Sequence, residues 1–417
     1  MKIINFIVFA FLFNSSYLLS VNDKVDATFI GYMMSNDGLG QIIPNLINVL
    51  NDKLSIKFVP TRPSMLENES EVVKSFSENY GTLENENILL FSEALWYPGG
   101  NHFDTSKLQA KLKIAYSMFE SDAIHKNWVE ILNNHFDMVV VPDKYYIGVY
   151  KNAGVNIPIF TIPLGLGNIE LFKNNRKFKR NVKPFVFGSS ASFWNHKNHE
   201  LLLDAFIQQF GNNPKFKLKL HGKFGADSYQ KIKNKIVNSK INNVELSTEL
   251  FTRNDYIKFL ESLNCYALLS KAEGFSLTPR EAMLIGLPCI LSNNTAHQTI
   301  CSSGLVIPVK SEIKKPAHNI IFNENIGNNF NCDVKDVKEA LLNAYNNYDK
   351  HLLLCKKRIA WAQKYDWNKL SLFFINLFKP KEIILGDKNL VTTDYLMTSS
   401  KVLYYKYMEL KESYVQK

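Results

Sequence analysis

Short apolar stretches alternate with amphipathic stretches along most of the chain. The first clear pair is Ala27–Met33, an apolar run, followed by Ile42–Leu50, which has helical periodicity. Continuous apolar runs of this length are typical of strands that are buried on both faces of a parallel sheet. Because such runs keep alternating with helical stretches, the pattern predicts parallel sheets with crossover helices, an α/β fold.

The same pattern predicts the elements of both halves of the chain. In the first half, strands are expected at Ala27–Met33, Ile56–Val59, Ile88–Phe91, Leu112–Met118, Met138–Val141 and Ile159–Ile162, with helices at Ile42–Leu50 and Lys144–Ala153. In the second half, strands are expected at Phe185–Phe187, Phe216–Leu220, Val244–Leu246, Cys265–Leu269 and Pro288–Leu291. Helices are expected there at His199–Phe210, Ser228–Val237, Asn254–Leu263, Pro279–Ile285, Val334–Tyr345, Leu352–Ala362 and Trp367–Phe378.

The alternation is interrupted once, by the polar and basic stretch Lys173–Lys183, which lacks apolar periodicity. This stretch is the best candidate for an interdomain linker. The expected organisation is a first α/β domain at 24–178, a second at 183–365, and a final helix with a C-terminal tail at 366–417. Two such domains enclose a cleft, and ligands of open α/β sheets bind beyond the carboxyl ends of the strands.

The first residues differ from the rest. Lys2 precedes the apolar run Ile3–Phe13, a second apolar patch ends at Leu19, and Ser20 follows. This order is typical of a signal peptide, and the apolar part could also serve as a membrane anchor. Residues 1–21 are therefore expected to lie outside both cores, which favours a membrane-associated, secreted or exported protein and leaves the cytoplasmic face of a membrane open.

Composition narrows the function classes. The 417 residues are 46% hydrophobic and 21% charged, with a formal net charge of +10. A basic surface attracts phosphates, anionic lipid or nucleic acid. The sequence has no stretch in which Lys and Arg alternate with aromatic residues, so nucleic acid is the weaker interpretation. None of the five cysteines falls into a pair of C-x-x-C motifs, so we expect neither a zinc site nor a disulfide framework.

The most informative segment is Ala272–His297, which follows an expected strand. Glu273 and Gly274 suit a turn, and Thr278 and Pro279 suit the cap and the first position of a helix that contains Glu281. The amides at such a helix start form an anion site that fits a diphosphate. Two alternatives need no ligand: Glu281 in a capping box, and Glu273 as an ordinary polar turn residue.

Three stretches together resemble retaining glycosyltransferases of the glycosyl transferases group 1 family, which have two Rossmann-like domains (the GT-B fold). The two carboxylates Glu273 and Glu281 resemble the E-x7-E signature. Phe187–Phe206 (FGSSASFWNHKNHELLLDAF) resembles the glycine loop, lysine and helix of the family. Ile114–Gly165 resembles one branch of the family in the acceptor-side domain. The resemblance covers about Ala27 to Phe378 and implies that a C-terminal helix crosses back to the first domain.

The resemblance also implies roles for single residues. Glu281 would bind the ribose of a nucleotide diphosphate-sugar, and Glu273 would bind the hydroxyls of the donor sugar. The amides of Gly274, Phe275 and Ser276 would assist Glu273. Lys197 would bind the diphosphate, although a lysine in front of a helix is often only a solvated surface residue.

Other matching positions are weaker signals. Gly188 and Ser189 would contact the donor, but many relatives have an arginine where this chain has Ser189. Glu120 stands near the place of a histidine that faces the sugar in many relatives, although it could instead pair with Lys126. Gly38 and Gly40 resemble the glycine loop below the donor, and a simple turn would look the same.

The resulting hypothesis is a glycosyltransferase that moves a sugar from a nucleotide diphosphate-sugar to a glycan, lipid or protein acceptor with retention. Glu273, Lys197 and Glu120 are the expected catalytic residues. No D-x-D motif or His/Asp cluster indicates a metal, and we expect no cofactor beyond the donor substrate. Two alternatives remain: a nucleotide-sugar epimerase of the same fold, and a non-catalytic sugar-binding protein.

Overall fold

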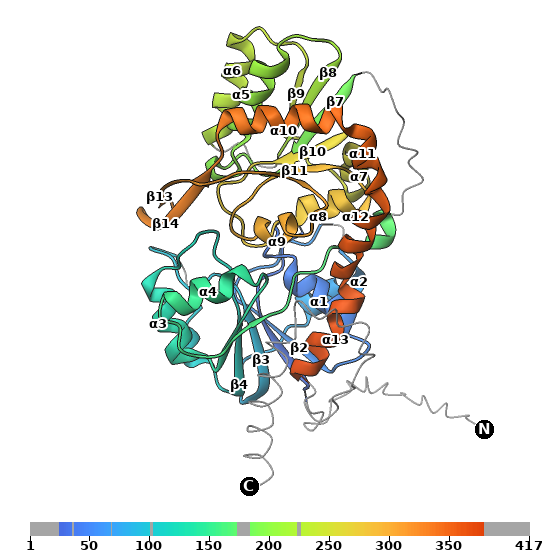
Figure 1. Cartoon of the computed structure of the whole chain (residues 1–417). Helices are drawn as coiled ribbons and strands as arrows, with labels where there is room; N and C mark the ends of the chain where they lie inside the picture. The colour runs from blue at the N-terminus through green and yellow to red at the C-terminus, as the bar shows by residue number, and fades with distance from the viewer. Residues whose placement is uncertain are drawn as a thin grey trace, which may run out of the picture.

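The structure is a computed structural model that describes residues 25–35, 37–67, 69–100, 103–172, 184–222 and 227–378. The expected signal or anchor segment, the expected linker and the tail beyond Pro380 lie outside these ranges. Within them, no helix combines the length and the apolar character needed to cross a membrane. The described chain forms two stacked α/β domains, one built around each half of the sequence (Figure 1).

The first domain contains a six-stranded parallel sheet in the order β2-β1-β3-β4-β5-β6. Its strands are β1 (Ala27–Gly31), β2 (Ile56–Pro60), β3 (Glu86–Ser92), β4 (Ala110–Tyr116), β5 (Met138–Val141) and β6 (Ile159–Thr161). Its helices are α1 (Ile42–Leu50), α2 (Glu71–Glu78), α3 (Lys126–His135) and α4 (Tyr145–Asn152). The sequence pattern missed α2 and α3, which bury few side chains.

The second domain contains a six-stranded parallel sheet in the order β12-β11-β10-β7-β8-β9. Its strands are β7 (Phe185–Ser190), β8 (Phe216–His221), β9 (Val244–Ser247), β10 (Cys265–Leu268), β11 (Cys289–Ser292) and β12 (Ile307–Val309). Its helices are α5 (His199–Phe210), α6 (Asp227–Asn238), α7 (Arg253–Glu261), α8 (Leu277–Leu284), α9 (His297–Cys301) and α10 (Val334–Asn346).

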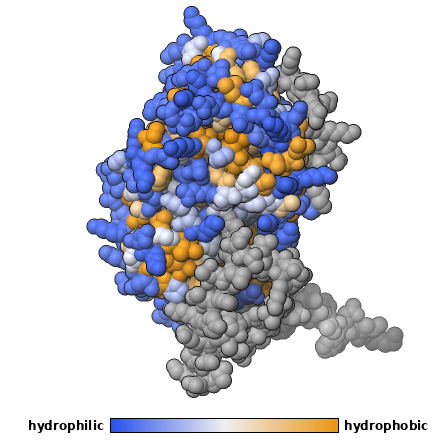
Figure 2. Space-filling model, viewed as in Figure 1, coloured by the Kyte–Doolittle hydropathy of each residue, from blue (hydrophilic) through white to orange (hydrophobic). Residues whose placement is uncertain are grey.

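Both sheets are covered by helices on their two faces, which explains the apolar runs in the sequence. The strand β5 and the strand β10 are buried at every position. Cys265 and Cys289 lie in this interior, where a thiol acts as a small buried hydrophobe, and all five cysteines are free thiols. The face of the molecule seen in Figure 2 is largely hydrophilic, with apolar residues visible near the level where the domains meet.

The described part of the chain ends with three helices, the last of which reaches the first domain as expected. These are α11 (Tyr348–Leu353), α12 (Cys355–Ala362) and α13 (Trp367–Phe378). The α13 helix packs on α1, and the ring centres of Phe378 and Phe29 lie 5.4 Å apart. The prediction of one helix at Leu352–Ala362 is wrong, because the helix is interrupted at Leu354. The buried Arg358 side chain donates to the carbonyls of His351, Leu305 and Gly286 around this break.

A β-hairpin that the sequence pattern did not predict extends from the second domain to the first. It consists of β13 (Ile313–Asn319) and β14 (Glu324–Asn331), which are antiparallel. In Figure 1 it lies on the side of the molecule opposite to α12 and α13. Asn328 N donates to Asp122 Oδ1 at 2.6 Å, and Glu324 Oε1 lies 2.6 Å from His125 Nε2. The domains are therefore joined on two sides.

Candidate active site

Three predicted catalytic residues meet where the carboxyl ends of the two sheets face each other. Glu120 follows β4 in the first domain, and Lys197 and Glu273 follow β7 and β10 in the second. Lys197 Nζ donates to Glu273 Oε1 at 2.9 Å and to Glu120 Oε1 at 3.1 Å. The structure thus brings together side chains that are 76 and 77 positions apart in the sequence.

The carboxylate of Glu273 is held from several directions. Its side chain is buried, with 4% of the residue exposed, and Ser270 Oγ donates to Oε1 at 2.6 Å. The Glu273 amide donates to Thr295 Oγ1 at 2.8 Å, and Tyr146 OH donates to its carbonyl at 2.7 Å. An ordinary turn residue needs none of these contacts, so the geometry favours a positioned carboxylate.

Lys197 and Glu120 form a charged pair that crosses the interface. Burial disfavours the charge on Glu120, but Lys197 and His196 outweigh it and hold the pKa of the carboxyl well below its usual range. Burial likewise disfavours the charge on Lys197, but Glu120 and Glu273 raise its pKa above the ordinary value. The alternative pairing of Glu120 with Lys126 does not occur, because Glu120 binds Lys197 and His196 instead.

The helix that carries Glu281 starts two residues earlier than expected. The N-cap of α8 is Ser276, which adopts a left-handed conformation with φ 69°, and Leu277 is the first helical residue. Thr278 is therefore not the cap, and its hydroxyl accepts from Tyr266 OH at 2.7 Å. The Ser276 hydroxyl is within 2.8 Å of His297 Nε2 and does not bind the helix amides. Similarly, the Asn198 side chain donates to the Leu269 carbonyl and does not cap α5.

Glu281 is not part of a capping box. Its side chain is nearly buried, with 6% of the residue exposed, and it accepts from Tyr256 OH at 2.9 Å. Arg253 Nη2 lies 2.8 Å from the other carboxylate oxygen. The guanidinium of Arg253 also lies 4.6 Å from the ring centre of Phe172. The two partners of Glu281 come from α7, so this carboxylate belongs to a side-chain network on the surface of the second domain.

The loop between Glu273 and α8 packs tightly. A side chain at Gly274 would collide with Met118 of the first domain unless the Met118 side chain moved, so glycine favours this close approach. The Phe275 ring lies 3.8 Å below the Arg280 guanidinium. Arg280 is fully buried, donates to the carbonyls of Phe275 and Ser276, and lies 3.4 Å from Asp143. Its guanidinium is therefore already engaged by groups of the protein itself.

The glycine and serine at the end of β7 lie inside the sheet. A side chain at Gly188 would overlap Leu263, and Ser189 is fully buried. The Ser189 hydroxyl has no hydrogen-bond partner among the described residues. This position therefore carries a small buried side chain and no positive charge.

The predicted glycine loop of the first domain is a tight turn stabilised by Asp37. Asp37 Oδ1 accepts from the Gly40 amide at 2.7 Å and from Tyr32 OH at 2.6 Å. Gly40 packs against the side chains of Tyr32 and Met34, whereas a side chain at Gly38 would meet open space. Gly38 is therefore the position of this turn that a ligand can approach.

Sequence reasoning missed several residues that position the predicted ones. Ser270 gave a weak signal, because it stands three positions before Glu273. Arg253, Tyr256, Tyr146 and Thr295 gave none, because their contacts with Glu281 and Glu273 span 22 to 127 positions and arise only from the fold. Within the described ranges, no group of three or more His, Cys, Asp or Glu residues is placed to hold a metal ion.

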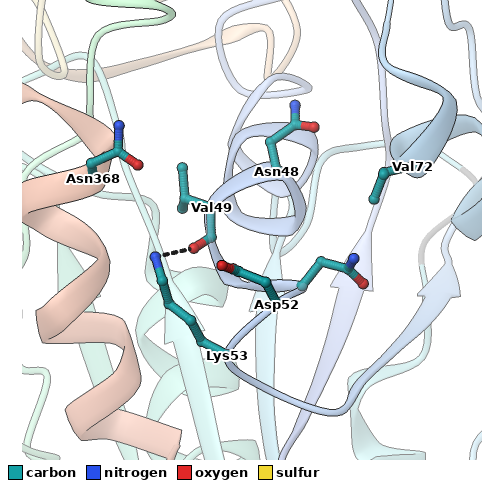
Figure 3. Close-up of a pocket in the computed structure, with 7 residues that line it drawn as sticks. Asn48, Val49, Asp52, Lys53, Val72 and Asn368 are labelled. Carbon is teal, nitrogen blue, oxygen red and sulfur yellow. Dashed lines mark hydrogen bonds between the residues drawn. The ribbon is translucent and has the colours of Figure 1, made fainter.

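A groove of about 170 Å³ lies elsewhere, at the C-terminal end of α1 (Figure 3). Its lining comes from α1, α2, α13 and the residues after α1: Asn48, Val49, Asn51, Asp52, Lys53, Val72 and Asn368. Lys53 Nζ donates to the Val49 carbonyl at 2.8 Å across it. Because helices in such a domain begin at the carboxyl ends of the strands, this end of α1 is remote from Glu273, and we assign the groove no role in the chemistry.

A comparison with known protein families matches the part of the chain that carries three of these residues. Residues 172–322, which include Lys197, Glu273 and Glu281, match the model of the family described as glycosyl transferases group 1. The chain is a glycosyltransferase. The family segment of this glycosyltransferase covers most of the second domain and ends within the turn of the β13–β14 hairpin.

Solved structures establish the fold of the glycosyltransferase as GT-B. HepE of Anabaena, in complex with UDP and glucose, superposes with a TM-score of 0.60 at 12% identity, covering 84% of this chain and 98% of that one. Sucrose-phosphate synthase from Thermosynechococcus elongatus gives 0.62 at 13% identity, covering 85% and 98%. Uncharacterized protein 356 of Sulfolobus islandicus rod-shaped virus 1 is 20% identical over 299 residues, 64% of this chain and 76% of that protein.

These findings confirm the predicted fold class, two Rossmann-like domains with a crossing C-terminal helix, and the predicted enzyme class. They do not favour the epimerase or the non-catalytic alternative. The roles of the single residues, the stereochemical course and the substrates remain predictions.

Proposed function

We propose that this glycosyltransferase moves a sugar from a nucleoside diphosphate-sugar donor to a hydroxyl group of a carbohydrate acceptor, with retention at the anomeric carbon. The observation that carries the proposal is the position of Lys197, which lies between Glu273 and Glu120 where the carboxyl ends of both sheets meet. Structures of similar fold were determined in complex with UDP and glucose and with UDP-glucose, which supports this class of donor.

In this proposal each carboxylate binds one part of the donor. Glu281 accepts hydrogen bonds from the ribose hydroxyls, and Glu273 accepts them from hydroxyls of the donor sugar. The contacts of Ser270 and Tyr146 fix Glu273 in advance, so little reorganisation is needed on binding. The amides of Gly274, Phe275 and Ser276, together with Gly38, line the donor.

Lys197 binds the diphosphate and stabilises it as it leaves. The bond between the anomeric carbon and the diphosphate oxygen breaks, and the electron pair stays on that oxygen. The acceptor oxygen bonds to the same face of the anomeric carbon, and its proton passes to the departing diphosphate. The N-terminus of α8, which is the positive end of the helix dipole, stabilises the negative charge of the diphosphate together with Lys197. Glu120 would compete with the diphosphate for Lys197, and it faces the sugar once the lysine turns to the phosphate.

The proposal includes neither a resident cofactor nor a metal ion, because the lysine and the helix terminus supply the positive charge. We also propose that residues 1–21 serve as a signal peptide or anchor and thus bring the enzyme to a membrane or into an export pathway.

A donor screen tests the function directly. Nucleotide-sugars are first ranked by thermal shift, since a ligand at 100 times its Kd stabilises the folded state by about 2.7 kcal/mol. Release of the nucleoside diphosphate is then followed with and without carbohydrate acceptors. Lys197→Met is expected to lower kcat roughly 100- to 1000-fold, whereas Lys335→Met, an exposed lysine of α10, should behave as wild type.

The outcomes separate the hypotheses. Acceptor-dependent nucleotide release with retained anomeric configuration is the expected result. Interconversion of the donor sugar without release would indicate an epimerase, and tight donor binding without any turnover would indicate a sugar-binding protein. Either result would overturn the proposal.

A further inference from the structure

A second polar cluster lies on the same edge of the first sheet as Glu120. Tyr32 follows β1, Thr61 and Arg62 follow β2, and Glu93 follows β3. The strands are neighbours in the order β2-β1-β3 and are parallel, so these residues lie together at the carboxyl edge. This edge faces the donor domain, because Glu120 at the end of the adjacent β4 binds Lys197.

The side chains of this cluster bind one another. Arg62 Nη2 lies 2.5 Å from Glu93 Oε1, and the Thr61 hydroxyl donates to the other carboxylate oxygen. The Arg62 guanidinium lies 3.6 Å from the centre of the Tyr32 ring. Tyr32 OH in turn donates to Asp37, which also binds the Gly40 amide. The cluster and the glycine turn of the proposed donor site are therefore one connected network.

Fold stability alone does not explain this network. The Glu93 side chain is only 10% exposed, and burial raises the pKa of its carboxyl despite the contacts with Thr61 and Arg62. A buried carboxylate at a strand end is costly for stability. The neighbouring Ser92 is 1% exposed, and its hydroxyl has no hydrogen-bond partner among the described residues. Arg62 is 44% exposed, so the cluster is accessible from solvent.

The charges of the cluster limit what it can bind. Asp37 and Glu93 contribute two negative charges, and Arg62 contributes one positive charge that Glu93 already neutralises. Asp37, Arg62 and Glu93 are the charged residues that affect the pKa of Tyr32 most. Arg62 and Asp37 are likewise the charged residues that affect the pKa of Glu93 most. A phosphate group carries up to two negative charges and needs unpaired Arg or Lys donors. Sugar hydroxyls, by contrast, can donate to carboxylates and accept from a guanidinium.

We propose that Tyr32, Arg62 and Glu93 form the acceptor subsite of this glycosyltransferase, and that the acceptor presents an unphosphorylated, hydroxyl-rich sugar there. The inference rests on the proposed function, because it concerns the second substrate of the same reaction. The acceptor hydroxyl attacks the anomeric carbon while the nucleoside diphosphate leaves and takes up the proton, so no further reactant is needed.

The test compares pairs of acceptors that differ by one phosphate group: glucose with glucose 6-phosphate, and fructose with fructose 6-phosphate. The wild-type chain, supplied with the donor that gives the largest thermal shift, should use the unphosphorylated member at least about tenfold better in kcat/KM. Glu93→Gln should raise the acceptor KM about tenfold and raise the donor KM by a smaller factor. Glu78→Gln, an exposed glutamate of α2, is the matched control.

A second variant is used if the first variant does not fold. If melting curves show that Glu93→Gln is not folded, Arg62→Gln replaces it, since this side chain is half exposed. Arg62→Gln should raise the KM of neutral sugars and increase the discrimination against phosphorylated ones. Preference for a phosphorylated acceptor, an equal rise in donor KM, or donor hydrolysis without use of any of these sugars would each overturn the inference.

Failure of the proposed function would look different. In that case neither donor hydrolysis nor a donor-induced thermal shift occurs in the wild-type chain. Sugar binding is then measured by saturation-transfer NMR on wild type and Glu93→Gln, and binding of the neutral sugar that is lost in the variant still supports the subsite. Absence of such binding overturns it.

Discussion

Replacing Glu281 separates its proposed role in donor binding from its role in the fold. Glu281→Ala removes the acceptor of Tyr256 OH and the partner of Arg253. Glu281→Gln keeps an acceptor for the tyrosine but loses the charge. If the carboxylate binds the ribose, both variants lose a charge-assisted hydrogen bond. We expect donor affinity to fall by about 1.5–3 kcal/mol, roughly 10- to 150-fold in Kd.

The fold should respond differently to the two variants. Glu281→Ala leaves a half-buried hydroxyl and a half-buried guanidinium without their partner, which costs about 1–3 kcal/mol. For a domain of this size each kcal/mol lowers Tm by roughly 2–4 °C. Arg253→Ala in the Glu281→Ala background should restore part of that loss, because it removes the unpaired cation.

The assay combines melting curves with donor titration for Glu281→Gln, Glu281→Ala, Arg253→Ala and the double variant. Glu339→Gln, an exposed glutamate of α10, serves as the matched control. Unchanged donor affinity in Glu281→Gln would refute the ribose assignment. Strictly additive losses of stability in the double variant would refute the coupling between Glu281 and Arg253.

Three further predictions concern pH, metal and the N-terminus. Burial lowers the pKa of His297 from 6.5 to about 4, so below pH 6.5 the unfolded chain takes up a proton that the folded chain does not. Stability should therefore fall by about 3 kcal/mol between pH 6.5 and 4, and His297→Gln should show a smaller fall; an unchanged pH profile of Tm would contradict this. Turnover should persist in a chelator, and its complete, metal-reversible loss would show the prediction wrong. A chain that starts at Asn22 should stay folded and bind donor, whereas unfolding on truncation would place Ile3–Phe13 in the core.

The sheets could be predicted from the sequence because their strands are buried on both faces. A run such as Met138–Val141 has apolar side chains at every position, and both the pattern and the structure give it the same ends. The hairpin of β13 and β14 could not be predicted in this way. Most of its side chains are exposed or half-buried, so no face imposes an apolar alternation on the sequence.

The candidate site was predictable only where its residues lie close together in the sequence. Glu273 and Glu281 could be found because one turn and one helix carry both. Their partners could not, because Arg253 approaches from α7 and Glu120 from the other domain. The helix start was placed wrongly at Thr278 because a serine rarely adopts the left-handed conformation that Ser276 has.

The hairpin and the crossing helices join the two domains on opposite sides of the molecule (Figure 1). On one side the chain itself returns through α12 and α13, and Leu166 forms a β-bridge with Asp366. On the other side only noncovalent contacts join the domains, notably Glu324 with His125 and Asn328 with Asp122. Any motion that separates the domains on the hairpin side has to break these contacts first. We therefore expect substitutions that remove these contacts to change the rate at which substrates exchange.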